Sequence, residues 1–164
     1  MLKFTVSLNM KLSLLVLPML AFAQNPPAAP EPALTPTEKQ FQETLNNVTF
    51  SGYYAQGDSK ELHEDRYVIE RVSKVKDDIW KFEARIQYNK QDMKVAMSFP
   101  VKFAGDTPVI SLTNYTVPGF GAFTARVVVY DGVYAGTWAS AKPGAKHGGT
   151  MFGKIVKNSA PAAQ

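Results

Sequence analysis

The sequence contains no cysteine, and beyond Ala23 it has no long apolar run. Without cysteine the chain cannot form disulfides, use a thiol nucleophile or carry a lipid on a cysteine, so its stability must come from packing. Without a second apolar run, no transmembrane helix is expected after the first segment. A G-x-S-x-G elbow, a phosphate-binding loop and a paired-carboxylate motif are also missing. We therefore expect no cofactor and no catalytic residue, and an enzyme is the least favoured class.

The charges nearly balance, since 18 lysines and arginines face 14 acidic residues and the formal net charge is +4. Lys3 and Lys11 supply two of these positive charges and lie in a segment that we expect to be removed. The remaining cations form no cluster and accompany no base-stacking motif. The sequence therefore predicts no nucleic-acid partner.

The first 23 residues have the pattern of an export signal. Lys11 precedes the apolar residues 12–22, and Ala21-Phe22-Ala23 is a small-x-small cleavage site. We expect a signal peptide at 1–23 and a secreted or periplasmic protein, with a bacterial source favoured for a cysteine-free exported chain. Met10 is an alternative start, because the signal that follows it is short but complete.

Composition divides the rest of the chain into three parts. Residues 24–36 are rich in proline and alanine, which predicts an extended linker. A single domain is expected over residues 37–157, which is long enough for one core but not for two. Residues 158–164 return to serine, alanine and proline and are expected to form a disordered tail.

One short helix is predicted at the start of this domain. Thr37 and Gln40 have the spacing of a capping box, and Phe41 and Leu45 lie one turn apart. The helix is expected to end near Asn46.

From Val48 onward apolar and polar residues alternate with a period of two. Trp80, Phe82 and Ile86, for example, fall on one face of a strand that has lysine, glutamate and arginine on the other. The pattern and its turn signals predict about eight strands and no second helix. The expected strands are residues 48–54, 66–76, 79–88, 93–103, 109–115, 122–130, 133–138 and 150–156.

Two tight turns predict which side chains face each other. Asp131-Gly132 is a strong two-residue hairpin turn, and counting outward from it places Val129 opposite Tyr134 and Ala125 opposite Trp138 on the inward face. Small residues then face large ones, as in a tapering interior.

The Asp77-Asp78 turn gives the second hairpin. Counting from it places Ser73 opposite Phe82 and Arg71 opposite Ala84, with Arg71 as an unusual charge on the inward face. This register is favoured because a slip of one residue would bury several charged side chains together.

Sequential antiparallel strands with one apolar face form either a barrel or a two-sheet sandwich. Short connections favour an up-and-down antiparallel β-barrel, and so do glycines inside strands at Gly52, Gly136 and Gly153, where a curled sheet would bend. The all-β fold class with one N-terminal helix follows from these patterns.

Two segments near the end of the chain carry a family resemblance. Gly136-Thr137-Trp138, followed after a loop by the glycine-rich residues 148–153, resembles the glycine-tryptophan strands of avidin- and lipocalin-type barrels, the calycins. The resemblance covers two strands and implies the barrel architecture. In those families the tryptophan lies in the first strand, so no ligand-binding residue is carried over.

The inward polar and aromatic residues are the candidates for a binding site. Arg71 is the leading candidate, because a buried arginine could bind a carboxylate-bearing ligand, or it could instead be a structural residue that caps carbonyls or stacks on tryptophan. The other candidates on the predicted inward face are Tyr67, Ser73, Tyr88, Tyr134 and Trp138, each of which could equally be core filling. Asp58, His63, Glu64 and Asp65 have no metal-site spacing, so we expect a solvated charge run and no metal site.

These patterns favour an exported, non-enzymatic barrel that holds a small apolar or amphipathic ligand in its interior, with an acidic group near Arg71. The alternative is a module of the cell envelope that binds another protein through its outer face or loops and has a filled barrel. An internal cavity of several hundred Å³ would favour the first, and a fully packed interior the second. An enzyme would require Arg71, a tyrosine and a histidine or carboxylate to converge in one cleft.

Overall fold

The structure is a computed structural model that describes residues 32–88, 91–142, 144 and 147–159. Contacts divide the chain into residues 1–30 and residues 31–164, and the described residues all belong to the second unit. The predicted signal peptide, residues 24–31 of the linker and residues 160–164 of the tail lie outside the described residues.

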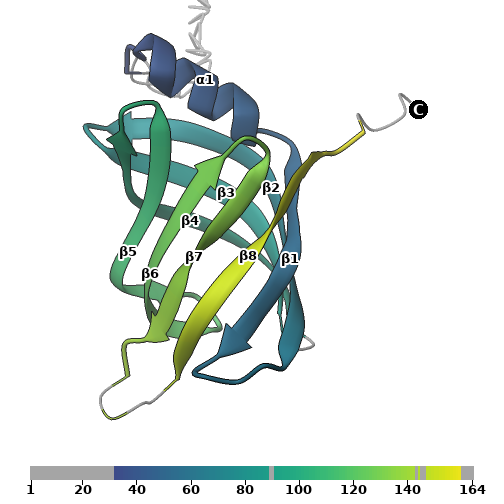
Figure 1. The fold of residues 1–164 in the computed structure, drawn as a ribbon. Helices are drawn as coiled ribbons and strands as arrows, with labels where there is room; N and C mark the ends of the chain where they lie inside the picture. The colour runs from purple at the N-terminus through teal and green to yellow at the C-terminus, as the bar shows by residue number, and fades with distance from the viewer. Residues whose placement is uncertain (1–31, 89–90, 143, 145–146, 160–164) are drawn as a thin grey trace, which may run out of the picture. The chain divides into compact units, whose positions relative to one another are not determined.

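The described residues form one helix, α1, and eight strands that close into an antiparallel barrel in sequence order (Figure 1). The closure comes from β1, which pairs with both β2 and β8. This confirms the predicted eight-stranded up-and-down barrel. The strands are β1 (Val48–Gln56), β2 (Leu62–Lys76), β3 (Ile79–Tyr88), β4 (Gln91–Ala104), β5 (Thr107–Val117), β6 (Gly121–Tyr130), β7 (Val133–Ser140) and β8 (Gly148–Lys157).

The helix α1 (Pro36–Leu45) begins earlier than predicted because its N-cap is Thr35, not Thr37. The Thr35 hydroxyl accepts a hydrogen bond from the Glu38 N–H at 3.3 Å, and Glu38 Oε2 accepts one from the Thr35 N–H at 2.9 Å. This is a complete capping box, and Pro36 fits the first helical position, where no N–H is needed. The prediction placed Thr35 and Pro36 in the linker.

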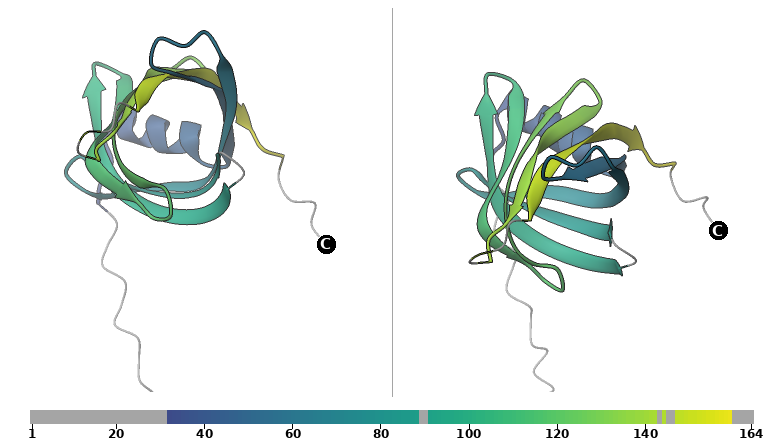
Figure 2. Two further views of the ribbon diagram at one scale, coloured as in Figure 1. Left: turned by 90° about the horizontal axis from the view of Figure 1, so that it is seen from below. Right: turned by 60° about the horizontal axis from the view of Figure 1, so that its bottom comes forward.

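The helix covers one end of the barrel (Figure 2). Large side chains fill the interior beneath it. Phe41 meets Trp80 edge to face, with ring centroids 4.9 Å apart, and Phe103 in the same manner at 5.6 Å. Leu45 and Trp80 have no exposed surface at all. This end of the barrel is therefore closed by packed core.

The β6–β7 hairpin has the predicted register. Asp131 and Gly132 both have positive φ, at 46° and 72°, as a type I′ turn requires. Tyr134 lies opposite Val129, and Trp138 lies opposite Ala125, which confirms this pairing.

The β2–β3 hairpin differs from the prediction because two β-bulges interrupt β2. Lys76 pairs with Ile79 at the turn, but Val75 and then Glu70 are extra residues on β2 relative to β3. Each extra residue reverses the alternation between inward and outward side chains. Between the bulges it is therefore Val72 that pairs with Phe82 and is fully buried.

The prediction that Arg71 and Ser73 point inward is wrong for this reason. Arg71 is exposed and pairs with Glu83 on the outer face, and Ser73 pairs with Lys81. Past the second bulge the alternation returns, so Tyr67 faces inward as predicted.

Asn46 and Asn47, which follow α1, form hydrogen bonds with the backbone around the second bulge. The pairing of β1 with β2 extends only to Ile69. Beyond it, the Val72 N–H donates to Asn46 Oδ1 at 2.6 Å, and the Asn47 N–H donates to the Glu70 carbonyl at 3.3 Å. These bonds supply partners that β1 does not provide.

The reversed alternation also turns Lys74 toward α1. Its Nζ lies 2.5 Å from Glu38 Oε1, and the two side chains are only 13% and 14% exposed. Burial alone would raise the pKa of Glu38, but hydrogen bonds from Lys74 and Thr35 outweigh it and hold that pKa below its ordinary value. Beneath the helix, the cation on the inward face is thus Lys74.

The first residue of the predicted tail, Asn158, is hydrogen-bonded to the start of the barrel. Asn158 donates its N–H to the Asn47 carbonyl at 3.0 Å, and its Oδ1 accepts from the Thr49 hydroxyl at 2.7 Å. Among the described residues, no helix has the length and apolarity needed to cross a membrane.

Candidate functional site

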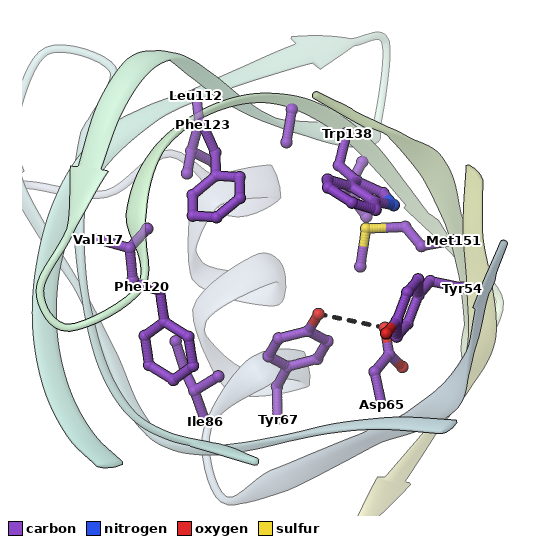
Figure 3. A pocket seen from close by; sticks show the side chains of 12 residues that line it. Tyr54, Asp65, Tyr67, Ile86, Leu112, Val117, Phe120, Phe123, Trp138 and Met151 are labelled. Atoms are coloured by element: carbon purple, nitrogen blue, oxygen red, sulfur yellow. Dashed lines mark hydrogen bonds between the residues drawn. The ribbon is translucent and has the colours of Figure 1, made fainter. Parts of the chain in front are cut away.

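A cavity of about 180 Å³ opens at the end of the barrel opposite α1 (Figure 3). This volume is below the several hundred Å³ expected of a hollow barrel, yet the interior is not packed throughout. The described lining is almost wholly apolar and contains a single carboxylate. The lining residues are Tyr54, Asp65, Tyr67, Ile86, Leu112, Val117, Phe120, Phe123, Ala125, Val127, Trp138 and Met151.

Asp65 is that carboxylate, and it is only 4% exposed. Its Oδ1 accepts a hydrogen bond from the Tyr134 hydroxyl at 2.9 Å, and its Oδ2 accepts one from the Tyr67 hydroxyl at 3.1 Å. Burial raises the pKa of Asp65, and the two hydroxyl bonds offset that effect only in part. Among the described residues, no lysine or arginine forms an ion pair with it.

Two glycines allow Tyr134 to reach Asp65 across the barrel wall. Tyr134 on β7 pairs with Gly153 on β8, Gly153 pairs with Gly52 on β1, and Gly52 pairs with Asp65 on β2. A Cβ at Gly52 would lie 2.5 Å from the Tyr134 hydroxyl, and one at Gly153 would lie 2.7 Å from its ring. The tyrosine therefore lies flat over both glycines, and its fully buried hydroxyl is bound by the carboxylate.

Burial and the neighbouring Asp65 carboxylate both raise the pKa of Tyr134 far above its ordinary value. Tyr134 therefore remains a hydrogen-bond donor. Together with Tyr67 it holds the Asp65 carboxylate in one orientation.

Aromatic side chains form the walls near the mouth of the cavity. The Tyr54 ring stacks on His63 with centroids 5.1 Å apart and meets Trp138 edge to face at 5.9 Å. Phe123 lies 6.3 Å from Trp138. Trp138 is half-buried, and its indole Nε1 is buried without a hydrogen-bond partner among the described residues. The wall thus offers aromatic faces and one unused donor.

The connection between β5 and β6 contributes Phe120. Gly119 and Gly121 have φ of 79° and 105°, in the region that favours glycine. The Phe120 N–H donates to the Val117 carbonyl at 3.0 Å, and this turn brings Phe120 into the lining. Gly119 also lies close against Met93, whose sulfur would be 2.5 Å from an added Cβ.

The structure brings some of the predicted site residues together and separates others. Tyr67 and Trp138 line the cavity, and Tyr134 lies beside it as the partner of Asp65. Arg71 and Ser73 face outward, so Arg71 does not lie at the cavity, where it was expected to meet an acidic ligand group. The Tyr88 side chain lies outside the described residues.

Asp65 is the functional candidate that the sequence reasoning missed. It was assigned to a solvated charge run, whereas β2 begins at Leu62 and places Asp65 inward, between His63 and Tyr67. A signal was present, because extending the period-two alternation of the strand back from Tyr67 places Asp65 on the same inward face.

The arrangement combines an apolar cavity with a carboxylate that two tyrosine hydroxyls hold in place. Within the described part of the chain, no group of three or more histidine, cysteine or acidic side chains gathers as a metal site. Of the residues whose convergence was expected for an enzyme, namely Arg71, a tyrosine and a histidine or carboxylate, Arg71 lies on the outer face. The remaining chemistry is an ionisable carboxylate in an aromatic cavity.

Comparison of the chain with protein-family models, with curated proteins and with solved structures finds no match. The resemblance to calycin barrels therefore stays a prediction beyond the shared barrel architecture.

Proposed function

We propose that this chain is an exported, non-enzymatic β-barrel that binds a small, largely apolar ligand in the cavity opposite α1. The observation that carries the proposal is the cavity itself, about 180 Å³ with an aromatic and aliphatic wall. Apolar cavities of about 150 Å³ are known to take up benzene. The ligand is accordingly a small molecule, or one end of a longer one that extends through the mouth.

Two further features support this proposal. The far end of the barrel is filled by Trp80, Phe41 and their neighbours, so a bound molecule would rest on packed core. Export is supported by the signal pattern in the first 23 residues, and a bacterial periplasm or exterior is the proposed location.

Binding is tested with propylbenzene, a neutral apolar probe, by isothermal titration and by the shift in melting temperature. Ala125 lines the cavity opposite Trp138, so Ala125→Phe should fill the cavity and reduce probe affinity at least tenfold. Ala96, exposed on β4, provides the matched control Ala96→Phe, which should bind as the unmodified protein does. Absence of any binding to the unmodified protein, or equal binding by Ala125→Phe, would contradict the proposal.

A second candidate function, a cell-envelope module that binds another protein, is favoured by an apolar row on the outer face. Val128, Ala135, Phe152 and Tyr53 pair in succession across β6, β7, β8 and β1. Phe152 and Tyr53 are 43% and 42% exposed, with ring centroids 6.3 Å apart. Contiguous exposed apolar surface of this kind is typical of interaction sites.

This candidate is tested with a photoreactive group at Ser51, which lies on the same outer face, in cells that make the protein. The group should cross-link to the bound protein, and Phe152→Ser should abolish this cross-link. The variant should still bind propylbenzene. A cross-link that is unaffected by Phe152→Ser would exclude the row as the interface.

A further inference from the structure

Asp65 is placed to select the charge of a ligand. Two tyrosine hydroxyls fix its carboxylate, and an ionised carboxylate has about four acceptor positions, so capacity remains for a donor from the cavity. Asp65 is itself a lining residue (Figure 3). None of the described lysines or arginines pairs with it.

The aromatic residues around this carboxylate favour the same sign of ligand charge. Tyr54, Tyr67 and Trp138 line the cavity with Asp65, and the faces of such rings attract a cation within about 6 Å of the centroid. An anionic ligand would be repelled by this carboxylate, which no described lysine or arginine pairs, in a site of low dielectric. A neutral hydroxyl could donate a hydrogen bond but would leave the charge of Asp65 uncompensated.

We propose that the ligand is a small hydrophobic amine, whose ammonium group pairs with Asp65 while its apolar body lies against the aromatic wall. This inference rests on the proposed function and deepens it by naming the ligand class. The Asp65 carboxylate is held rigidly by the row of paired residues Tyr134, Gly153, Gly52 and Asp65. It is therefore oriented before a ligand enters, which reduces the entropy lost on binding.

The test compares ligands of nearly the same shape and different charge: phenethylamine, phenethyl alcohol and phenylacetate, with propylbenzene as the apolar reference. Affinities are measured by isothermal titration at neutral pH for the unmodified protein, Asp65→Asn and Glu64→Gln. Glu64 is the matched control because it is the exposed, outward neighbour of Asp65 on β2.

The unmodified protein should bind phenethylamine about tenfold more tightly than phenethyl alcohol, and phenylacetate most weakly. Asp65→Asn should bring the ratio of amine to alcohol affinity to about one and leave propylbenzene binding unchanged. Glu64→Gln should keep the tenfold ratio, because a charge outside the barrel acts only through screened solvent.

A second measurement needs no change at Asp65. In the unmodified protein, the ratio of amine to alcohol affinity should fall as the pH is lowered and the carboxyl is protonated. Among the described residues, the titratable groups around Asp65 are Tyr67, Tyr134, Tyr54 and His63. The titration is therefore repeated with His63→Gln, which should show the same fall.

The outcomes separate this inference from the proposed function. Equal binding of amine and alcohol, or an amine preference that survives Asp65→Asn or low pH, would overturn the amine assignment while propylbenzene binding upheld the cavity. Failure of all four molecules to bind would overturn both.

Discussion

Gly52 and Gly153 shape the candidate site as much as Asp65 does, because any side chain at either position would collide with Tyr134. The sequence marked both glycines as places where the sheet bends, and it placed Tyr134 on the inward face. Their shared role depends on the pairing of four strands, β7, β8, β1 and β2, and the first two lie beside the last two only because β8 closes onto β1. Residue patterns along one strand do not reveal such a contact.

Asp65 should make the stability of the barrel depend on pH. Because burial raises its pKa in the folded state, the folded protein binds this proton more tightly than the unfolded chain does. The contribution of Asp65 to the free energy of unfolding should therefore fall as pH rises from 3.8, its ordinary pKa, through the raised value, and stay reduced above it.

This contribution is measured by urea unfolding across that pH range, as the difference between the unmodified protein and Asp65→Asn. At neutral pH, Asp65→Asn should change stability by less than about 1 kcal/mol, because the amide oxygen still accepts a hydrogen bond and no charge is buried. Asp65→Ala should cost about 1–3 kcal/mol, because the buried hydroxyl of Tyr134 loses its acceptor. A difference that rises with pH would contradict the assignment.

At the scale of the elements, the sequence predicted the alternation of inward and outward residues along the strands but not the β-bulges that interrupt it in β2. The β6–β7 register was predictable because Asp131-Gly132 fixes the turn and no residue is inserted beyond it. In β2, Glu70 and Val75 each add one residue, and nothing in their side chains marks them as bulges. Beside the second bulge, the Val72 N–H donates to the Asn46 side chain at the end of α1, which lies far away in sequence.

The bulged register predicts opposite effects for two neighbouring residues. Val72→Ala should lower the free energy of unfolding by about 1–2 kcal/mol, because two buried methyl-sized groups are lost in packed core. Arg71→Ala should change it by no more than about 1 kcal/mol, as expected for an exposed residue beside Glu83, and should leave propylbenzene affinity unchanged. Chemical denaturation of both variants measures these changes in the free energy of unfolding. A larger loss for Arg71→Ala than for Val72→Ala would contradict the bulged register and favour the regular one.

At the scale of the whole domain, the two ends of the barrel differ in their packing. Beneath α1, Phe41 and Trp80 fill the interior, whereas the opposite end contains the cavity and the aromatic residues around Trp138. The alternation of strand residues predicts an apolar interior along the whole barrel but not where it is filled. That difference comes from α1, which covers a single end (Figure 2).

Phe41→Ala should therefore separate the stability of the domain from its binding. The ring is 4% exposed and packs against Trp80 and Phe103, so its removal should cost about 3–5 kcal/mol in urea unfolding. Sites that share no partners contribute nearly independently, so propylbenzene should still bind at the opposite end with an affinity within about threefold of the unmodified protein. Gln40→Ala, on the exposed side of α1, is the control and should leave both quantities nearly unchanged. If Phe41→Ala instead abolished propylbenzene binding at the opposite end, the filled end and the cavity would have to be coupled through the barrel interior, and the helix would be part of the binding site rather than a cover for the core.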